Sequence, residues 1–228
     1  MSEEPIAMRP LTATIRTQVE LPLRFVDGYT TEARVFSFDG LVDCREHLAF
    51  ALGECTAPHP ADERRVPLIR PHSECLTGEV FGSQRCDCGP QLREAVERIA
   101  EDGGYLLYLR QEGRGIGLYS KLEAYALQDA GADTYEANLA LGHAEDERSY
   151  LAAAQMLHAL GESRVALLSN NPDKARQLRS GGVTVVEQVP TGVYVSDANQ
   201  HYLETKARRG RHTLDLPGTL DAASGRRR

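Results

Sequence analysis

The sequence lacks the features of membrane, secreted and duplex-binding proteins. No apolar run approaches the roughly 20 residues that cross a bilayer. The first segment, MSEEPIAMRP, is acidic where a secretory signal would carry an apolar core. The formal net charge is −7, so the chain has no excess of positive charge to attract duplex nucleic acid. We therefore expect a cytoplasmic protein that binds neither membranes nor nucleic acid.

Cysteine is scarce as well, and its number and spacing argue against disulfide bonds. The 228 residues include five cysteines, an odd number, and two of them lie one residue apart. Thiols stay reduced in the cytoplasm, and a chain of this length folds without covalent links. Metal binding is therefore the better interpretation of the closely spaced cysteines. Cys44 and Cys55 have no partner at ligand spacing, and we expect both to be buried as small apolar residues.

Segments of strand-like and helix-like pattern alternate along the chain. Three strand-like segments lie within 14–54, and apolar runs predict further strands at 66–70, 105–110, 164–169 and 183–189. Helical spacing follows each of the first three of these runs, and one of the predicted helices has Asp146 as its cap. The alternation predicts a mixed α/β fold. We expect a flexible lead-in at 1–13, one domain at 14–212 and a disordered basic tail at 213–228.

Cys75, Cys86 and Cys88 form the clearest metal-ligand pattern. Three thiolates without a fourth cysteine nearby suit a tetrahedral zinc ion whose fourth position holds water, as in catalytic sites. His72 is close enough in sequence to close the shell as in a structural site, and buried thiols without metal are a third interpretation. A catalytic zinc lowers the pKa of bound water to about 7 and so supplies hydroxide at neutral pH.

Two polar segments follow the cysteines. The loop RQEGRGIG (110–117) lacks the Lys-Ser end of a Walker loop and the spacing of a dinucleotide fingerprint. It is either an ordinary turn or a loop in which Arg114, together with Lys174, pairs with phosphate. The segment GHAEDERSY (142–150) is either a helix start with acidic residues near the positive end of the dipole, or a carboxylate proton acceptor, Asp146, beside a phosphate-binding Arg148.

Seven segments together resemble the GTP cyclohydrolase II family, in this order and with similar gaps. They are HSECLTG, RCDCG, QEGRGIGL, KLEAYALQD, GADTYEAN, EDERSY and NNPDK, and the resemblance covers about residues 15 to 212. It implies a GTP cyclohydrolase II-like α/β fold (mixed α+β), with mixed sheets and packed helices. It also implies zinc-dependent opening of the imidazole ring of GTP, releasing C8 as formate and the terminal phosphates as pyrophosphate. The product would be 2,5-diamino-6-ribosylamino-4(3H)-pyrimidinone 5′-phosphate, the first committed intermediate of riboflavin synthesis.

The resemblance also implies roles for single residues. The three cysteines would bind zinc, whose water attacks C8, and Tyr125 would assist hydrolysis near the metal. Asp146 matches the assigned proton acceptor, and Arg148 matches the assigned nucleophile at the α-phosphate. The positions that match GTP contacts are Arg70, Pro71, His72, Ser73, Glu74, Gln91, Glu112, Gly113, Arg114, Thr134, Ser169 and Lys174. Magnesium would accompany the triphosphate, and the family is usually dimeric, which implies a homodimer.

Two questions stay open at this point. A guanidinium stays protonated in proteins, so elementary chemistry makes Arg148 a charge stabiliser rather than a nucleophile. The same site could also stop at a formylated pyrimidine or serve a specialised pathway. Some relatives that lack the tyrosine at position 125 stop there, so its presence favours full release of formate. The non-enzymatic alternative is a zinc-stabilised nucleotide-binding module without turnover.

Overall fold

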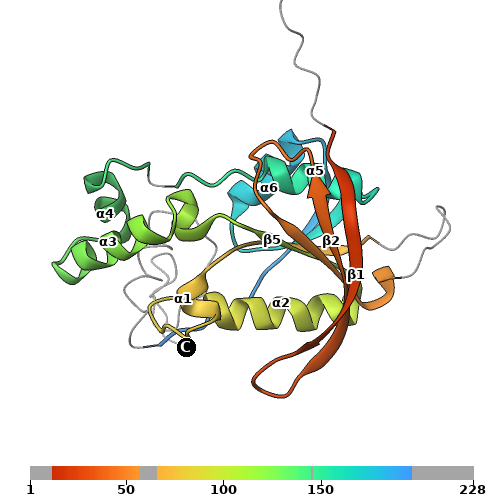
Figure 1. Cartoon of the computed structure of the whole chain (residues 1–228), viewed down its shortest axis with the longest axis horizontal. Helices are drawn as coiled ribbons and strands as arrows, with labels where there is room; N and C mark the ends of the chain where they lie inside the picture. Colours follow the sequence, from red (N-terminus) through yellow and green to blue (C-terminus); the bar gives the residue numbers. More distant parts are fainter. Residues whose placement is uncertain (1–11, 57–65, 145, 197–228) are drawn as a thin grey trace, which may run out of the picture.

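The computed structural model describes residues 12–56, 66–144 and 146–196, in which seven strands form one mixed sheet (Figure 1). The strands are β1 (Thr14–Arg24), β2 (Thr30–Asp39), β3 (Leu48–Leu52), β4 (Leu68–Ser73), β5 (Gly104–Leu109), β6 (Arg164–Leu168) and β7 (Thr184–Val189). Their order in the sheet is β1-β2-β3-β5-β4-β6-β7. The first three strands and the β3–β5 pair are antiparallel, whereas β5, β4, β6 and β7 are parallel. This arrangement confirms the predicted mixed α/β class.

Helices cover both faces of the sheet. Helix α2 (Cys88–Asp102) lies on one face, and helices α5 (Leu151–Ala159) and α6 (Pro172–Ser180) lie on the other (Figure 1). The apolar stripe of α2, which includes Val96 and Ile99, packs with buried side chains of β4, β5 and β6. The alanine-rich α5 packs into a second, separate core with α6 and the opposite face of the strands. Each helix therefore covers the sheet with the apolar face that its spacing predicts.

The central parallel strands β4 and β5 are almost wholly buried, which explains their largely apolar sequences. Every residue of β5 except Tyr108 is buried. The strands β4 and β5 approach so closely at their start that a Cβ on Gly104 would lie 1.9 Å from the carbonyl oxygen of Leu68. A glycine is required there, and it fixes the register of the two central strands.

The carboxyl ends of the parallel strands meet where the chain changes direction. From β4 the chain continues to β5 on one side, and it then crosses to β6 on the other side of β4. Ligands of open α/β sheets bind at such a switch point. The short helix α1 (Leu76–Glu79), the 3₁₀ turn η3 (Glu112–Gly115) and helices α3 (Leu118–Asp129) and α4 (Thr134–Ala140) follow β4 and β5 at this end. Figure 1 shows α3 and α4 extending away from the sheet.

Several expectations need correction or lie outside the described residues. Helix α5 begins at Leu151 with Tyr150 as its cap, so Asp146 caps no helix, and the segment before it is irregular. Cys44 is exposed with a left-handed backbone, φ 54°, because it lies in a turn rather than in the core. The side chain of Cys55 and the tail at 213–228 lie outside the described residues. Within the described helices, none is long and apolar enough to cross a membrane.

Candidate active site

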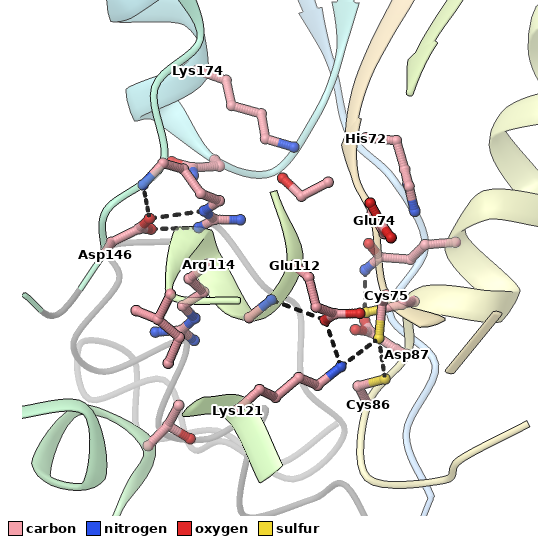
Figure 2. A pocket seen from close by; sticks show the side chains of 18 of the residues that line it. His72, Glu74, Cys75, Cys86, Asp87, Glu112, Arg114, Lys121, Asp146 and Lys174 are labelled. Carbon is pink, nitrogen blue, oxygen red and sulfur yellow. Dashed lines mark hydrogen bonds and ion pairs between the residues drawn. The ribbon is translucent and has the colours of Figure 1, made fainter. Parts of the chain in front are cut away.

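A pocket of about 460 Å³ opens at the carboxyl ends of the parallel strands (Figure 2). Its walls come from the ends of β4, β5 and β6, from the first turns of α2 and α6, and from α3 and the segment before α5. Every site residue predicted from the sequence lines it except Pro71. Pro71 takes part through its backbone, because its carbonyl oxygen accepts a hydrogen bond of 2.7 Å from Lys174 Nζ.

The three cysteines of the predicted metal site lie together on one wall. Their sulfur atoms are all within 4.8 Å of one another, and Sγ of Cys75 is 3.6 Å from Sγ of Cys86. A tetrahedral zinc with Zn–S bonds of about 2.3 Å separates its sulfur ligands by about 3.8 Å. The observed spacing therefore fits a zinc ion. Cys88 is the first residue of α2, where the helix dipole favours a thiolate.

Protonation of the cysteines is shared within the cluster. Hydrogen bonds from the thiols of Cys86 and Cys88 lower the pKa of Cys75 far below its ordinary value. The same contact with Cys75 raises the pKa of Cys86 to about 11, and that of Cys88 also rises. The three thiols are thus packed closely enough for each to perturb the ionisation of the others.

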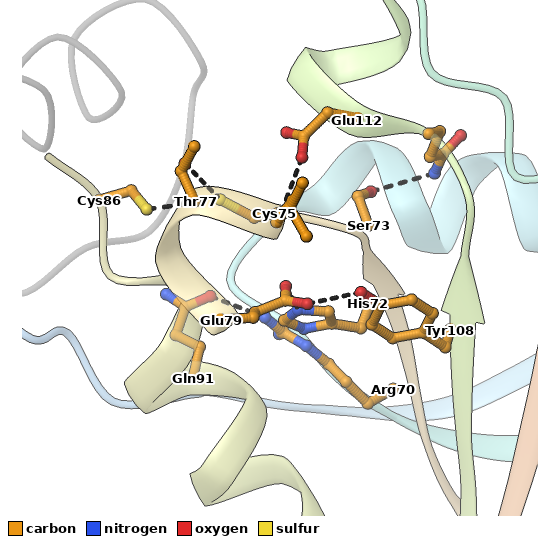
Figure 3. A network of polar contacts seen from close by, with 12 residues as sticks. Arg70, His72, Ser73, Cys75, Thr77, Glu79, Cys86, Gln91, Tyr108 and Glu112 are labelled. Carbon is orange, nitrogen blue, oxygen red and sulfur yellow. Dashed lines mark hydrogen bonds and ion pairs between the residues drawn. The ribbon is translucent and has the colours of Figure 1, made fainter. Parts of the chain in front are cut away.

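His72 belongs to a different network and does not close the metal shell. Figure 3 shows its ring beside Glu79 and Tyr108, below the strand that leads to Cys75. Its Nε2 lies 2.8 Å from Oε1 of Glu79, and the Tyr108 hydroxyl donates to Oε2 of the same carboxylate at 2.6 Å. Burial lowers the pKa of His72, so the ring is neutral at pH 7. Among the described residues the candidate metal cluster holds only the three cysteines, which favours an open shell over a closed structural site.

Lys121 and Glu112 form an ion pair beside the sulfur atoms. The ammonium of Lys121 lies 2.7 Å from Oε1 of Glu112, 3.0 Å from Oγ1 of Thr77 and 3.2 Å from Sγ of Cys75. Glu112 also accepts backbone hydrogen bonds from Leu76, at 2.7 Å, and from Gly113, at 2.9 Å. The carboxylate therefore joins the loop after β5 to the start of α1 at the metal-binding wall.

Tyr125 lies one helical turn beyond Lys121 on α3, with its ring near two cations. The Arg85 guanidinium is 4.5 Å from the ring centroid and Lys121 Nζ is 5.7 Å from it. Arg85 is itself paired with Asp129. Burial raises the pKa of Tyr125 to about 12. The hydroxyl thus stays protonated at neutral pH and is a hydrogen-bond donor close to the cysteines.

Asp146 and Arg148 form a bidentate ion pair at the opposite side of the pocket. Nε of Arg148 donates to Oδ1 of Asp146 at 2.8 Å, and Nη2 donates to Oδ2 (Figure 2). Burial opposes ionisation of Asp146, but these bonds from Arg148 outweigh it and lower the pKa of the carboxyl. An aspartate with a lowered pKa is a weak base, and a guanidinium paired with it keeps its proton. The Asp146 carboxylate therefore holds the Arg148 guanidinium in place as a cation.

The remaining cations are held by buried polar partners. Arg70 donates to the Leu168 carbonyl oxygen at 3.0 Å and to Oε1 of Gln91 at 2.8 Å. The backbone of Arg114 is left-handed, with φ 62°, and its carbonyl oxygen accepts a hydrogen bond from the amide of Glu147. Such a conformation costs energy for a residue with a side chain and is common at functional sites. It brings Arg114 and the segment with Asp146 into the same pocket.

Sequence reasoning missed several residues that line the pocket. Those with polar side chains are Asp87, Lys121, Gln128, Asn138, Asn170, Asn171, Asp173, Arg176, Gln177 and Thr191. A signal existed for Lys121, because its spacing of four residues from Tyr125 places both side chains on one face of a helix. The asparagines gave no such signal, since Asn138 lies on α4 and Asn170 and Asn171 lie between β6 and α6, segments that only the fold brings together.

The sequence comparisons with known proteins agree on one family. The sequence model described as GTP cyclohydrolase II matches residues 16–190. The chain is 49% identical over 185 residues to the GTP cyclohydrolase-2 of Vibrio cholerae, covering 81% of this chain and 91% of that protein. It is 51% identical over 205 residues to the riboflavin biosynthesis protein RibBA of Bacillus velezensis, covering 90% of this chain and 50% of that longer protein. A crystal structure of RibBX from A. baumannii, a two-domain 3,4-dihydroxy-2-butanone 4-phosphate synthase, matches 80% of this chain and 41% of its own, with 18% identity and a TM-score of 0.38.

Proposed function

The chain belongs to the GTP cyclohydrolase II family, and we propose that it hydrolyses GTP to 2,5-diamino-6-ribosylamino-4(3H)-pyrimidinone 5′-phosphate, formate and pyrophosphate. The activity is that of GTP cyclohydrolase II, in riboflavin biosynthesis. One observation supports the proposed reaction. The three-cysteine cluster and the cationic side chains of Arg70, Arg114, Arg148 and Lys174 line the same pocket. The wall with the three cysteines is the metal-binding wall, and the wall with Arg114, Arg148 and Lys174 is the cationic wall. Together they suit a substrate with a reactive ring at one end and phosphates at the other.

Zinc is the metal that this donor set favours. Thiolate ligands select zinc over magnesium or calcium, and the sulfur separations fit tetrahedral geometry. When bound, the ion would supply hydroxide at neutral pH for attack on C8 of the purine ring. Tyr125, kept protonated near the sulfurs, would donate a hydrogen bond to an oxygen that develops charge during ring opening.

The phosphates would lie against the other wall. Arg114, Arg148 and Lys174 supply positive charge there, and a magnesium ion bound to the triphosphate would complete its neutralisation. We assign Arg148 the role of stabilising charge at the α-phosphate rather than that of a covalent nucleophile. The support is its bidentate pair with Asp146, which orients the guanidinium and keeps it protonated. Asp146 in this state is a positioning group, and it becomes a better proton acceptor only if substrate draws Arg148 away.

The base and ribose would contact the remaining predicted positions, which lie at the end of β4 and on the elements around it. Arg70 and His72 line the pocket, and so do the other predicted positions Ser73, Glu74, Gln91, Gly113, Thr134 and Ser169. Glu112 is one of the predicted GTP contacts, and a carboxylate there could accept hydrogen bonds from the N1–H and amino groups of guanine. Its carboxylate already accepts three bonds from Leu76, Gly113 and Lys121. A carboxylate has about four acceptor sites, so Glu112 would give guanine one bond at most without rearrangement.

The activity is tested by incubating zinc-loaded protein with GTP and magnesium. Formate and pyrophosphate should appear in equal amounts, and mass analysis should show the product without a formyl group. A product that retains one extra carbonyl would support the alternative that stops at the formylated pyrimidine. No formate from fully zinc-loaded protein would exclude the proposed reaction, and tight GTP binding without product would instead identify a binding module.

A homodimer is the expected assembly, and the edge of the sheet offers a surface for it. Among the described strands β1 pairs only with β2, and its apolar side chains Ile15, Val19 and Leu21 are 40%, 48% and 40% exposed. An edge strand of this kind can pair with a second copy. Light scattering on the purified protein tests the assembly, and Val19→Lys should shift it toward the monomer.

We also expect the protein to be located in the cytoplasm.

A further inference from the structure

Lys121 is a buried cation that contacts a sulfur of the cysteine cluster, although no role was predicted for it from the sequence. Its residue is 8% exposed, and its ammonium donates to Sγ of Cys75 at 3.2 Å. We propose that Lys121 is a positioning residue that sets the electron-donor strength of the Cys75 sulfur and thereby the properties of the bound metal. The inference rests on the proposed function, because it requires a metal ion at the three cysteines.

The charge balance of the site explains why a cation is needed at this place. A divalent ion with three thiolates carries a net charge of −1, in a wall where Cys75 and Cys86 are buried. A buried charge without compensation is costly. An ammonium at hydrogen-bond distance offsets that charge, and its N–H group withdraws electron density from the sulfur. The bound metal then stays a stronger Lewis acid than three unmodified thiolates would allow.

Glu112 does not cancel this effect. Its carboxylate is an ion-pair partner of Lys121, but the amides of Leu76 and Gly113 also donate to it. Those two backbone bonds stabilise the negative charge of Glu112, so the ammonium is shared between carboxylate and sulfur. The same arrangement fixes the side chain of Lys121, which also bonds Thr77. The lysine thus reaches the sulfur in one defined conformation.

Cobalt-substituted protein gives a direct readout of the sulfur. Removing the N–H donor raises the energy of the sulfur lone pairs, so the cysteine-to-cobalt charge-transfer band of Lys121→Met should move to longer wavelength. Lys121→Arg, which keeps the charge and the donors, should restore the band toward its original position. Lys174→Met is the matched control, because Lys174 is equally buried in the pocket but donates to the Pro71 carbonyl rather than to a cysteine. That variant should leave the band unchanged.

Metal affinity and turnover provide the second measurement. Removing a group that hydrogen-bonds a metal ligand typically lowers metal affinity or activity by about 10- to 100-fold. We expect the zinc affinity of Lys121→Met, measured by competition with a chelator, to fall by a factor in that range. An unmoved band in cobalt-loaded Lys121→Met would overturn the inference, and so would an equal shift in Lys121→Arg. If Lys121→Met takes up no cobalt, retention by Lys121→Arg supports the inference and loss in both overturns it. A wild-type protein without any charge-transfer band would instead refute the metal site itself.

Discussion

Gly78 supports the cysteine cluster by leaving space for it, and replacing this glycine tests the metal geometry. A Cβ at position 78 would lie 2.7 Å from Sγ of Cys86 and 3.2 Å from Sγ of Cys75. Nonbonded heavy atoms approach to about 3.5 Å, so the Cys86 sulfur would need to move by about 0.8 Å. Metal–ligand distances tolerate only about 0.2 Å. The displacement is therefore about four times larger than a metal site accepts.

We expect Gly78→Ala to fold but to bind zinc poorly. Alanine is a better helix former than glycine by about 1 kcal/mol, so the short helix itself does not disfavour the change. Zinc content after dialysis against a chelator, the temperature of unfolding and formate release are the three measurements. Zinc should be substoichiometric and formate release should fall in proportion to it. Magnesium-dependent binding of GTP to the cationic wall should change much less.

Gly82→Ala is the control for this experiment. Gly82 lies in the same segment between Cys75 and Cys86 and has a left-handed backbone, φ 66°, but a Cβ there would meet no atom within 4 Å. The substitution therefore strains the loop without touching a sulfur, and it should keep its zinc. Full zinc content and wild-type affinity in Gly78→Ala would refute the reasoning, because the sulfurs would then have room that the structure does not show.

Four further predictions follow from the site. Cys86→Ser should lose zinc and all formate release, since a neutral hydroxyl is a poor zinc ligand; a variant that keeps both contradicts the ligand assignment. Tyr125→Phe should reduce the rate of formate release more than the affinity for GTP, and an equal loss of both would indicate a structural role. Arg148→Lys should retain measurable turnover, reduced about 10²- to 10³-fold, with no covalent adduct by mass spectrometry; complete loss together with a wild-type adduct at Arg148 would favour the nucleophile. The pKa of His72 is lowered by burial, so the unfolded chain binds the extra proton and stability should fall as pH drops below about 6.5; urea unfolding at pH 7 and pH 5.5 should show a smaller loss in His72→Gln.

The sequence predicted the layered fold well because its determinants are local. The apolar runs at β5 and β6 and the helical spacing of α2 each follow from residues within one element. The exception is the segment before α5, where acidic residues suggested a helix start at Asp146. There a side-chain pair with Arg148 replaced the expected cap. A local charge pattern does not show whether a carboxylate bonds the backbone or a neighbouring guanidinium.

The sequence named many of the residues that line the pocket, but not the contacts between them. The positions came from the resemblance to a family, whereas composition and spacing left catalytic zinc, structural zinc and free thiols open. The contact of Lys121 with Cys75 spans 46 residues of sequence, and that of Arg70 with Leu168 spans 98. Such contacts exist only once the strands are ordered side by side. The pairing that occupies Glu112 and the burial that lowers the pKa of His72 are consequences of that order.

Cys88 is both a predicted metal ligand and the first residue of α2. Helix α2 in turn supplies Val96 and Ile99 to one of the two hydrophobic cores and Gln91 to the pocket. Metal binding is therefore coupled to the local stability of this layer, since an ion that holds Cys88 also fixes the first turn of the helix. Loss of metal should open that turn before the sheet unfolds. Amide hydrogen exchange at the start of α2 should then be faster in the metal-free protein than in the metal-bound protein, so that the helix reports metal occupancy.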